Sequence, residues 1–226
     1  MNLSIQAAIF DLDGTLIDSM GLWEKIDHEF LSRRGIVTPN DYVEVVKTLT
    51  FNQSARYAIE RFSLPDTEEM VIREWMDMAL FEYSNNITLK PGALAYLKFL
   101  QKHQIKIGLA TTNTPLLYEP LLRNNGVYDF FSSFTTLSEV ERDKGHPDIY
   151  LLAAGKMEVS AQSCLVFEDT LLGVTGAKRA QMTVIGVYDE SSASEKAQIA
   201  TQADGCVCNF EQMLKYHQSG SIDKYI

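Results

Sequence analysis

One stretch decides the fold of this chain: Ala7-Ala8-Ile9-Phe10-Asp11-Leu12-Asp13-Gly14-Thr15-Leu16. Its apolar part predicts a buried β-strand from Ile5 to Phe10, and two carboxylates follow directly. Because strand side chains alternate between faces, we expect Asp11 and Asp13 to point the same way and to share one small space. Paired acids at that distance need a cation between them or a proton on one carboxyl group. A plain strand followed by an Asp-Gly turn is the alternative interpretation.

The run Asp11-Leu12-Asp13-Gly14-Thr15 resembles the first motif of the haloacid dehalogenase-like (HAD) superfamily. The resemblance implies that Asp11 is a nucleophile and that Asp13 is a general acid and base. It also implies three further motifs, which should follow in order along the chain.

Composition limits the other possibilities. The chain has 226 residues, of which 46% are hydrophobic, so one large or two modest domains can bury a core. We find neither an apolar run of about 18 residues nor a secretion signal, and we therefore expect a cytoplasmic protein with no membrane partner. The formal net charge of −10 argues against nucleic acid. A small phosphorylated metabolite is the expected partner, and the chain is expected to be a monomer or a weak homodimer.

The three cysteines do not form a disulfide framework and fit a reducing compartment. Cys164 opens an apolar run and is expected in the core. Cys206-Val207-Cys208 lacks a second Cys or His pair at metal-ligand spacing, so we expect these two cysteines to be buried structural residues.

The pattern of residues 18–86 predicts four helices, because apolar residues recur at helical spacing after residues that commonly begin a helix. The expected starts are Asp18-Ser19, Thr38-Pro39, Asn52 and the run Asp66-Thr67-Glu68-Glu69, which resembles a capping box. The connections near residues 16–17 and 85–90 are where such a unit could hinge as a lid.

Residues 1–17 and 87–226 alternate strands with helices, which predicts an α/β fold with a Rossmann-like parallel sheet covered on both faces. After the first strand, the expected strands are 105–110, 131–135, 164–167, 183–187 and 204–208. Ligands of such sheets bind beyond the carboxyl ends of the strands. A HAD-like core with residues 18–86 as an inserted four-helix cap resembles the subgroup that contains β-phosphoglucomutase and sugar-phosphate phosphatases.

The second motif is Thr111-Thr112-Asn113-Thr114-Pro115, a polar cluster at the end of a predicted strand and the start of a helix. Helix N-termini favour anions through free N–H groups and the helix dipole. The resemblance identifies Thr111 as the phosphate-binding residue, with Thr112 and Asn113 nearby. For Thr114, which precedes a proline, simple helix capping is the preferred interpretation.

The third motif is Lys144-Gly145-His146-Pro147-Asp148, although the commoner form of the family has proline where Gly145 stands. The resemblance implies that Lys144 neutralises the nucleophile and the phosphoryl oxygens. Taken alone, Lys144 would be interpreted as a solvated surface lysine. His146 has no partner at ligand spacing, so we expect a structural or exposed residue.

The fourth motif is Leu165-Val166-Phe167-Glu168-Asp169-Thr170, an apolar strand that ends in two acids. An acidic cap for the next helix explains these acids by itself, and the same oxygens also suit Mg²⁺. The resemblance implies that Asp169 is a direct metal ligand and that Glu168 is a ligand or a water-mediated partner.

Together the motifs imply a Mg²⁺-dependent phosphatase that hydrolyses a small phosphate monoester, such as a sugar phosphate, through an aspartyl-phosphate intermediate. Asp11 attacks phosphorus, and Asp13 protonates the leaving oxygen and later activates water. The metal ligands are expected to be Asp11, Asp13 through its carbonyl, Glu168 and Asp169. The phosphoryl group is expected to be held by Leu12, Gly14, Thr15, Thr111, Thr112, Asn113 and Lys144.

A β-phosphoglucomutase-type isomerase is the main alternative. The mutase pattern has a histidine where this chain has Trp23, and basic residues in the loop at 49–52. Residues 18–88 also carry 7 basic and 13 acidic residues, a net charge of −6 that suits a second phosphate poorly. Lys47 and Arg56 remain possible substrate contacts.

Three further classes are disfavoured. A dehalogenase would lack Asp13. A phosphonate hydrolase would need a Schiff-base lysine, and neither Lys25 nor Lys47 lies in a recognisable motif. A non-catalytic binding protein would be expected to lack Asp11, Lys144 or Asp169, and all three are present.

Overall fold

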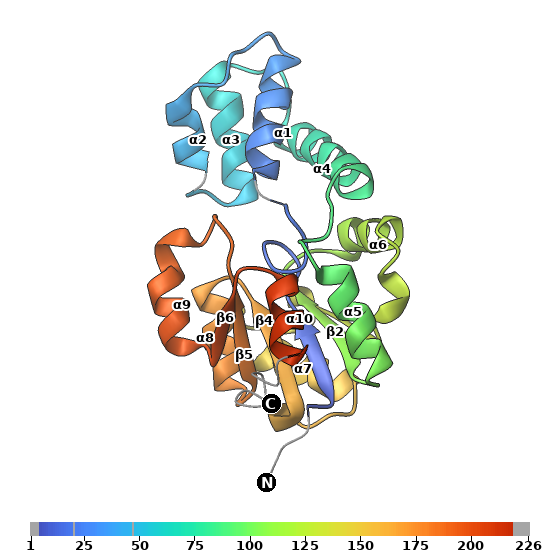
Figure 1. The fold of residues 1–226 in the computed structure, drawn as a ribbon. Helices are drawn as coiled ribbons and strands as arrows, with labels where there is room; N and C mark the ends of the chain where they lie inside the picture. The colour runs from blue at the N-terminus through green and yellow to red at the C-terminus, as the bar shows by residue number, and fades with distance from the viewer. Residues whose placement is uncertain (1–4, 20, 47, 219–226) are drawn as a thin grey trace. The chain divides into compact units, whose positions relative to one another are not determined.

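The computed structural model describes residues 5–19, 21–46 and 48–218. These residues form two compact units: a helical unit, Gly21–Asn86, and an α/β unit made by the described residues on either side of it (Figure 1). In the described part of the chain, every helix is too short or too polar to cross a membrane.

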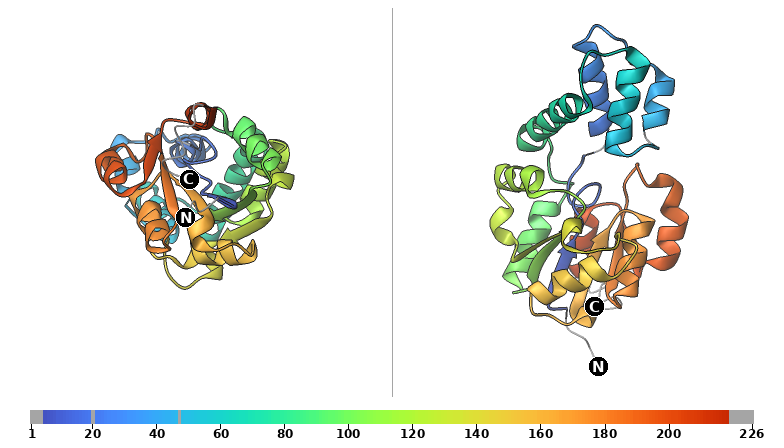
Figure 2. Two further views of the ribbon diagram at one scale, coloured as in Figure 1. Left: turned by 60° about the horizontal axis from the view of Figure 1, so that its bottom comes forward. Right: turned by 180° about the vertical axis from the view of Figure 1, so that it is seen from behind.

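The α/β unit contains a six-stranded sheet in the order β3-β2-β1-β4-β5-β6, in which all neighbouring strands run parallel. Helices cover both faces of this sheet (Figure 2). The strands are β1 (Ala7–Phe10), β2 (Lys106–Thr111), β3 (Ser133–Thr136), β4 (Cys164–Glu168), β5 (Thr183–Val187) and β6 (Gly205–Val207). The helices are α5 (Ala93–Lys102), α6 (Pro115–Asn124), α7 (Asp148–Lys156), α8 (Leu171–Arg179), α9 (Lys196–Gln202) and α10 (Phe210–Gln218).

The two central strands separate the core into two layers. Ile9 of β1 pairs in register with Val166 of β4, and both side chains join the buried cluster beneath α7 and α8. The next residue on each strand points to the opposite face, because strand side chains alternate. There Phe10 stacks on Phe167 with ring centroids 4.8 Å apart, and Tyr96 of α5 packs edge-on against Phe167.

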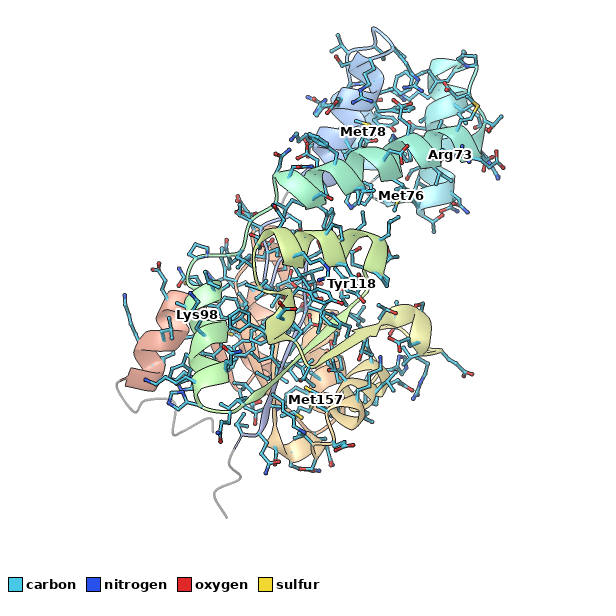
Figure 3. All side chains as sticks on the ribbon, turned by 90° about the vertical axis from the view of Figure 1, so that its right-hand side faces the viewer. Arg73, Met76, Met78, Lys98, Tyr118 and Met157 are labelled. Atoms are coloured by element: carbon cyan, nitrogen blue, oxygen red, sulfur yellow. The ribbon has the colours of Figure 1, made fainter. Side chains whose placement is uncertain are left out.

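The outer strand β3 is covered by α6. Tyr118 of α6, labelled in Figure 3, stacks on Phe134 with ring centroids 5.5 Å apart. A helix therefore covers the outer strand β3 as well, as parallel sheets require.

The predicted parallel sheet is confirmed, with strand ends displaced by one or two residues. Helix α9 was not predicted. Ile199 is its one buried apolar residue, so Lys196–Gln202 shows no apolar periodicity that would indicate a helix. Cys164 is buried in the core as predicted. The prediction that Cys206 and Cys208 are buried is wrong, since both lie at the short edge strand β6 and are exposed.

The helical unit consists of α1 (Leu22–Ser32), α2 (Asn40–Val46), α3 (Phe51–Phe62) and α4 (Glu68–Asn85). Its core includes Phe30 of α1 packed edge-on against Trp75 of α4, with ring centroids 5.5 Å apart. Arg34, which follows α1, donates hydrogen bonds to Asp66 and Glu74 and so ties α1 to the start and the middle of α4.

Two predicted helix starts in this unit are wrong. Helix α1 begins after Gly21, which adopts a left-handed conformation with φ of 67°, and not at Asp18-Ser19. Helix α3 is capped by Thr50, whose hydroxyl accepts a hydrogen bond from the Gln53 N–H, and not by Asn52. Helix α4 starts within the predicted run Asp66–Glu69, and its cap is Thr67, whose hydroxyl accepts a hydrogen bond from the Met70 N–H.

Candidate active site

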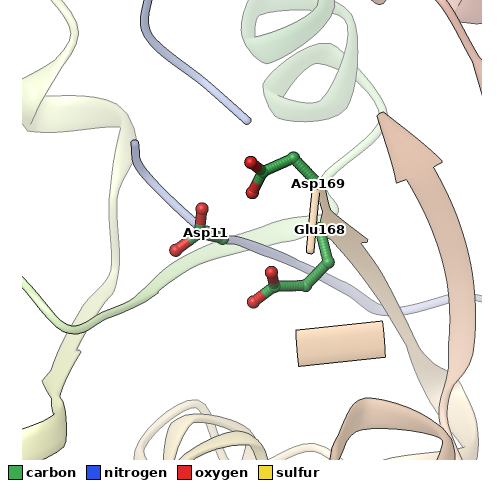
Figure 4. Close-up of side chains that lie close together, drawn as sticks. All are labelled: Asp11, Glu168 and Asp169. Atoms are coloured by element: carbon green, nitrogen blue, oxygen red, sulfur yellow. The ribbon is translucent and has the colours of Figure 1, made fainter. Parts of the chain in front are cut away.

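The first and fourth motifs meet because β1 and β4 are neighbours. The Asp11 N–H donates to the Phe167 carbonyl at 3.0 Å, which extends the pairing one residue beyond β1. Asp11 therefore leaves the sheet beside Glu168 and Asp169, and all three side chains are buried. Each offers a carboxylate oxygen that lies within 4.8 Å of the others (Figure 4). We call these three residues the acidic cluster.

Lys144 is buried against this cluster. Its Nζ donates to Asp11 Oδ1 at 2.5 Å and to Glu168 Oε1 at 2.6 Å. Burial acts to lower the pKa of Lys144, but the two carboxylates outweigh burial and hold the pKa above its usual range. Lys144 therefore carries a positive charge, and the interpretation of this residue as a solvated surface lysine is wrong.

Glu168 is held from two sides. Its Oε1 accepts from Lys144 and, at 2.7 Å, from the buried hydroxyl of Tyr150 on α7. Its Oε2 has no hydrogen-bond partner among the described residues and rests against Gly173, where a Cβ would lie only 2.1 Å away. The position of Glu168 thus depends on a hydroxyl at residue 150 and on the absence of a side chain at residue 173.

Asp169 is fixed by the loop after β1. The Thr15 hydroxyl donates to Asp169 Oδ1 at 3.0 Å. Gly14 has a φ of 80°, and a Cβ there would lie 2.3 Å from Asp169 Oδ2. Only glycine allows both this backbone conformation and this close approach.

The acidic cluster has more negative charge than Lys144 can neutralise. Burial, reinforced by the neighbouring carboxylates of Asp11 and Glu168, raises the pKa of Asp169. Burial and Asp11 likewise raise the pKa of Glu168, although Lys144 and Tyr150 act in the opposite direction. Three buried carboxylates that gather hard oxygen atoms, and whose negative charge Lys144 offsets only in part, fit a divalent cation such as Mg²⁺.

Asp13 is not one of the three carboxylates that form the acidic cluster. Its Oδ2 accepts a hydrogen bond from Asn113 Nδ2 at 3.0 Å. Strand β1 ends at Phe10, so the alternation of strand side chains does not extend to Asp13. The structure links the first motif to the second through Asp13 and Asn113.

The loop after Asp13 is a tight turn. The Gly14 N–H donates to the Ile17 carbonyl at 3.2 Å, and the Thr15 N–H donates to the Leu12 carbonyl at 3.3 Å. Both bonds are long for backbone hydrogen bonds. A phosphate held by these two N–H groups would have to share them with the carbonyls of the turn.

Thr111 is the last residue of β2 and is fully buried. Its Oγ1 accepts from the Asn113 N–H at 3.0 Å, and Asn113 Oδ1 accepts from the Thr114 N–H at 2.7 Å. Thr114 is the N-cap residue of α6 and Pro115 is the first helical residue, as predicted, although the Thr114 side chain accepts no hydrogen bond from the helix. Within the described ranges, no hydrogen bond joins Thr111 or the exposed Thr112 to the acidic cluster.

Gly145 replaces the commoner proline for two local reasons. Its N–H donates to Asp143 Oδ1 at 3.0 Å, which a proline could not do. A Cβ at residue 145 would also lie 2.6 Å from the Leu172 side chain. His146 lies 3.1 Å from Asp143 at the surface and does not join the acidic cluster, as expected.

In the helical unit, two positively charged residues weighed in the sequence analysis have acidic partners. Arg56, a possible substrate contact, pairs with Glu68 at 2.8 Å, and Lys25, considered as a Schiff-base lysine, pairs with Glu82 at 2.7 Å. Lys47 lies outside the described residues.

The helical unit also carries an aromatic pair near its N-terminus. Trp23 is 45% exposed and packs edge-on against Phe51, with ring centroids 5.2 Å apart.

Sequence reasoning did not find Tyr150, Gly173 or the ion pair between Lys90 and Asp189. For Tyr150, the one available signal was its place on the apolar face of a predicted helix, since a buried hydroxyl needs a hydrogen-bond partner. The identity of that partner depends on how α7 packs beneath β4.

Comparisons with known proteins agree with this geometry. A family model described as haloacid dehalogenase-like hydrolase matches residues 5–181. The "Probable pseudouridine-5'-phosphatase" of Drosophila melanogaster is 31% identical, over 90% of each chain. Hexitol phosphatase B of Escherichia coli (strain K12) is 27% identical over 81% of this chain and 83% of its own length, and the β-phosphoglucomutase of Bacillus subtilis has the same identity and coverage.

Solved structures share the fold. A candidate β-phosphoglucomutase from Thermotoga maritima superposes with a TM-score of 0.85 at 24% identity, over 95% of this chain and 99% of the other. The CbbY protein of Rhodobacter sphaeroides in complex with phosphate has a TM-score of 0.72 at 24% identity, over 91% and 95% of the two chains. From the family match and the relative that is 31% identical, we conclude that this chain belongs to the haloacid dehalogenase-like hydrolases.

Proposed function

We propose that this hydrolase is a Mg²⁺-dependent phosphatase that hydrolyses a small phosphate monoester, in the first place a sugar phosphate, through an aspartyl-phosphate intermediate. The chain is a phosphoric monoester hydrolase by its family and by the phosphatases among its relatives. The observation that carries the finer proposal is Asp11, a buried carboxylate in contact with Lys144 and beside Glu168 and Asp169.

Asp11 is the proposed nucleophile. Its carboxylate forms a bond to phosphorus while the bond from phosphorus to the ester oxygen breaks. Lys144 orients the Asp11 carboxylate, and its positive charge is placed to stabilise oxygens that gain negative charge in the transition state.

The acidic cluster is the proposed metal site. Asp11, Asp169 and the carbonyl of Asp13 would hold Mg²⁺, with Glu168 as a ligand or a water-mediated partner. When bound, the ion would neutralise charge on the phosphoryl oxygens. The buried carboxylate oxygens and the raised pKa values of Glu168 and Asp169 support this assignment.

Asp13 is the proposed general acid and base. It gives a proton to the leaving oxygen and then takes a proton from the water that hydrolyses the aspartyl phosphate. The hydrogen bond from Asn113 supports this role, because it orients the Asp13 carboxylate.

The remaining predicted residues would bind the transferring phosphoryl group. Thr111 lies at the end of β2, next to β1, and Asn113 already contacts Asp13. Leu12, Gly14, Thr15 and Thr112 are the other proposed phosphate contacts.

Hydrolysis is preferred to the mutase reaction because of the helical unit. Trp23 stands where the mutase pattern has histidine, and Arg56 is already paired with Glu68. The relatives include both kinds of enzyme, with pseudouridine-5′-phosphatase and hexitol phosphatases on one side and β-phosphoglucomutase on the other. We also expect a lid role for the helical unit, a cytoplasmic location and a monomer or weak homodimer, which stay predictions.

A panel of phosphate monoesters with Mg²⁺ tests the proposal. We expect release of inorganic phosphate from at least one sugar, hexitol or nucleoside monophosphate, and loss of this activity with a chelator. With β-glucose 1-phosphate, formation of glucose 6-phosphate faster than inorganic phosphate would reverse the choice in favour of a mutase.

A further inference from the structure

Lys90 and Asp189 form a buried ion pair that has no part in the proposed reaction. Lys90 Nζ lies 2.7 Å from Asp189 Oδ2, and the two side chains are only 8% and 3% exposed. Lys90 Nζ also donates to the Tyr188 carbonyl at 3.1 Å. Ser191 donates to Asp189 Oδ1 from its N–H at 2.9 Å and from its hydroxyl at 2.5 Å. Both oxygens of the Asp189 carboxylate are thus held in place.

The pair joins two segments that are 99 residues apart in the chain. Asp189 follows β5, and Lys90 lies just before α5. The Lys90 N–H donates to the Leu16 carbonyl at 2.9 Å, and the neighbouring Leu89 pairs with Ile17 across an antiparallel bridge. Lys90 therefore binds the loop after β1 through its backbone N–H, and it binds the loop after β5 through its side chain.

Asp189 reaches the turn that carries the first motif. A Cβ at Gly14 would lie 3.4 Å from Asp189 Cγ and 2.3 Å from Asp169 Oδ2. The turn between Asp13 and Thr15 is therefore packed against two carboxyl groups. One of these belongs to the acidic cluster, and Lys90 holds the other.

Stability alone is a poor reason for such a pair. Removing two charges from water costs about as much as their attraction returns, so buried ion pairs contribute mainly by fixing one arrangement of the chain. The charge also matters locally, because an unpaired Asp189 would add a further negative charge beside a site for phosphate. Lys90 supplies both the neutralising charge and the geometric constraint.

We propose that Lys90 and Asp189 are positioning residues for phosphoryl transfer, which hold the Gly14 turn, and with it Asp13 and Thr15, in the geometry of the reaction. The inference rests on the proposed function, since it assigns a role within that site. Neither residue is assigned a contact with substrate. Loss of the pair should therefore lower kcat far more than it raises KM.

The test compares Lys90→Met, Asp189→Asn and Lys90→Arg with a matched control. The control is Lys178→Met, which removes an ion pair of the same length, 2.7 Å to Asp204, that lies at the surface of the same unit. The first measurement is amide hydrogen exchange at residues 14–17, which needs no substrate. The second is kcat and KM with a phosphate monoester and Mg²⁺.

We expect Lys90→Met and Asp189→Asn to speed exchange at residues 14–17 by about tenfold and to lower kcat by about tenfold or more, with KM changed less than about threefold. Lys90→Arg should recover a large part of both losses, and Lys178→Met should change neither. Exchange and kcat at wild-type values in Lys90→Met would overturn the inference.

The double variant Lys90→Met, Asp189→Leu covers the case in which single variants fold poorly. An apolar pair of similar volume should restore thermal stability without restoring the polar contacts to Tyr188 and Ser191. We expect kcat to stay low in this stable protein. A wild-type kcat would show that the ion pair has only a structural role, and would overturn the inference.

If the wild-type chain hydrolyses no phosphate monoester, the proposed function fails. The hydrogen-exchange data still decide whether the ion pair holds the turn.

Discussion

The Thr15 hydroxyl donates a hydrogen bond to Asp169 at 3.0 Å, and this contact joins residues that are 154 positions apart. Both groups are buried. Loss of the Thr15 hydroxyl would remove a hydrogen-bond donor from Asp169 Oδ1, in a site that already has excess negative charge. We predict that Thr15→Val weakens Mg²⁺ binding by about tenfold, the equivalent of one hydrogen bond to a charged group. Thr15→Ser keeps the hydroxyl and should bind nearly as the wild type does. Titration calorimetry of both variants checks this, and equal affinities would contradict it.

Gly173 allows Glu168 to occupy its place. A Cβ at residue 173 would lie 2.1 Å from Glu168 Oε2, so Gly173→Ala must displace the glutamate or α8. We expect a loss of roughly 1–3 kcal/mol in the free energy of unfolding, together with reduced turnover.

Gly155 on α7 provides the matched control for that substitution, because a Cβ there would meet no atom within 4 Å. Gly155→Ala should leave turnover unchanged and should stabilise the protein by up to about 1 kcal/mol, since alanine favours a helix interior. Urea unfolding and phosphate release measured on both variants decide the matter. Similar stability in the two proteins would show that Glu168 has more room than the structure gives it.

The hydroxyl of Tyr150 should be required for the position of Glu168. Tyr150→Phe removes the 2.7 Å hydrogen bond to Glu168 Oε1 and leaves Lys144 as the donor to that atom. We predict a loss of about 1–3 kcal/mol in the free energy of unfolding, because a buried acceptor loses a donor. Tyr42→Phe is the comparison in the helical unit, where the hydroxyl contacts Asp27 at 3.3 Å, and only Tyr150→Phe should also lower turnover.

Stability without metal should fall as pH rises. Burial and neighbouring acids raise the pKa values of Glu168 and Asp169 in the folded protein, so above about pH 4 these two groups bind more protons in the folded state than in the unfolded state. Their contribution to the free energy of unfolding must then decrease with increasing pH until both folded groups have ionised. Mg²⁺ on the same carboxylates would remove this loss.

Thermal unfolding with and without Mg²⁺ tests that dependence. The stabilisation by Mg²⁺ should be larger at about pH 8 than at about pH 5, because protons compete for the carboxylates at the lower pH. Asp169→Asn should remove most of the difference. Equal stabilisation by Mg²⁺ at both pH values would count against the acidic cluster as the metal site.

Much of the fold could be predicted from local patterns. Apolar runs ending in polar residues located all six strands, and strand-helix alternation gave the parallel sheet. The errors in the helix starts came from positions where several neighbouring residues could each cap the helix. Asp18-Ser19 and Asn52 are good caps in sequence, but Gly21 and Thr50 start the helices, because the backbone path between helices decides which residue lies at the end.

The candidate site was predictable to the extent that strand neighbours bring motifs together. Asp11 and Asp169 meet because β1 and β4 pair, and Lys144 reaches both Asp11 and Glu168. The supporting contacts of Tyr150 were not predictable, because they depend on how helices pack on the sheet. The contact between Asp13 and Asn113 was not predicted for another reason, since β1 ends at Phe10 and the alternation argument stops there.

Covalent phosphorylation of Asp11 is the most direct test of the proposed mechanism. Wild-type protein mixed with Mg²⁺ and a hydrolysed phosphate monoester is quenched in acid within a turnover, and its peptides are analysed by mass spectrometry. We predict one phosphoryl group on the peptide that contains Asp11, and neither this adduct nor measurable turnover in Asp11→Asn. Wild-type turnover in Asp11→Asn would contradict the account.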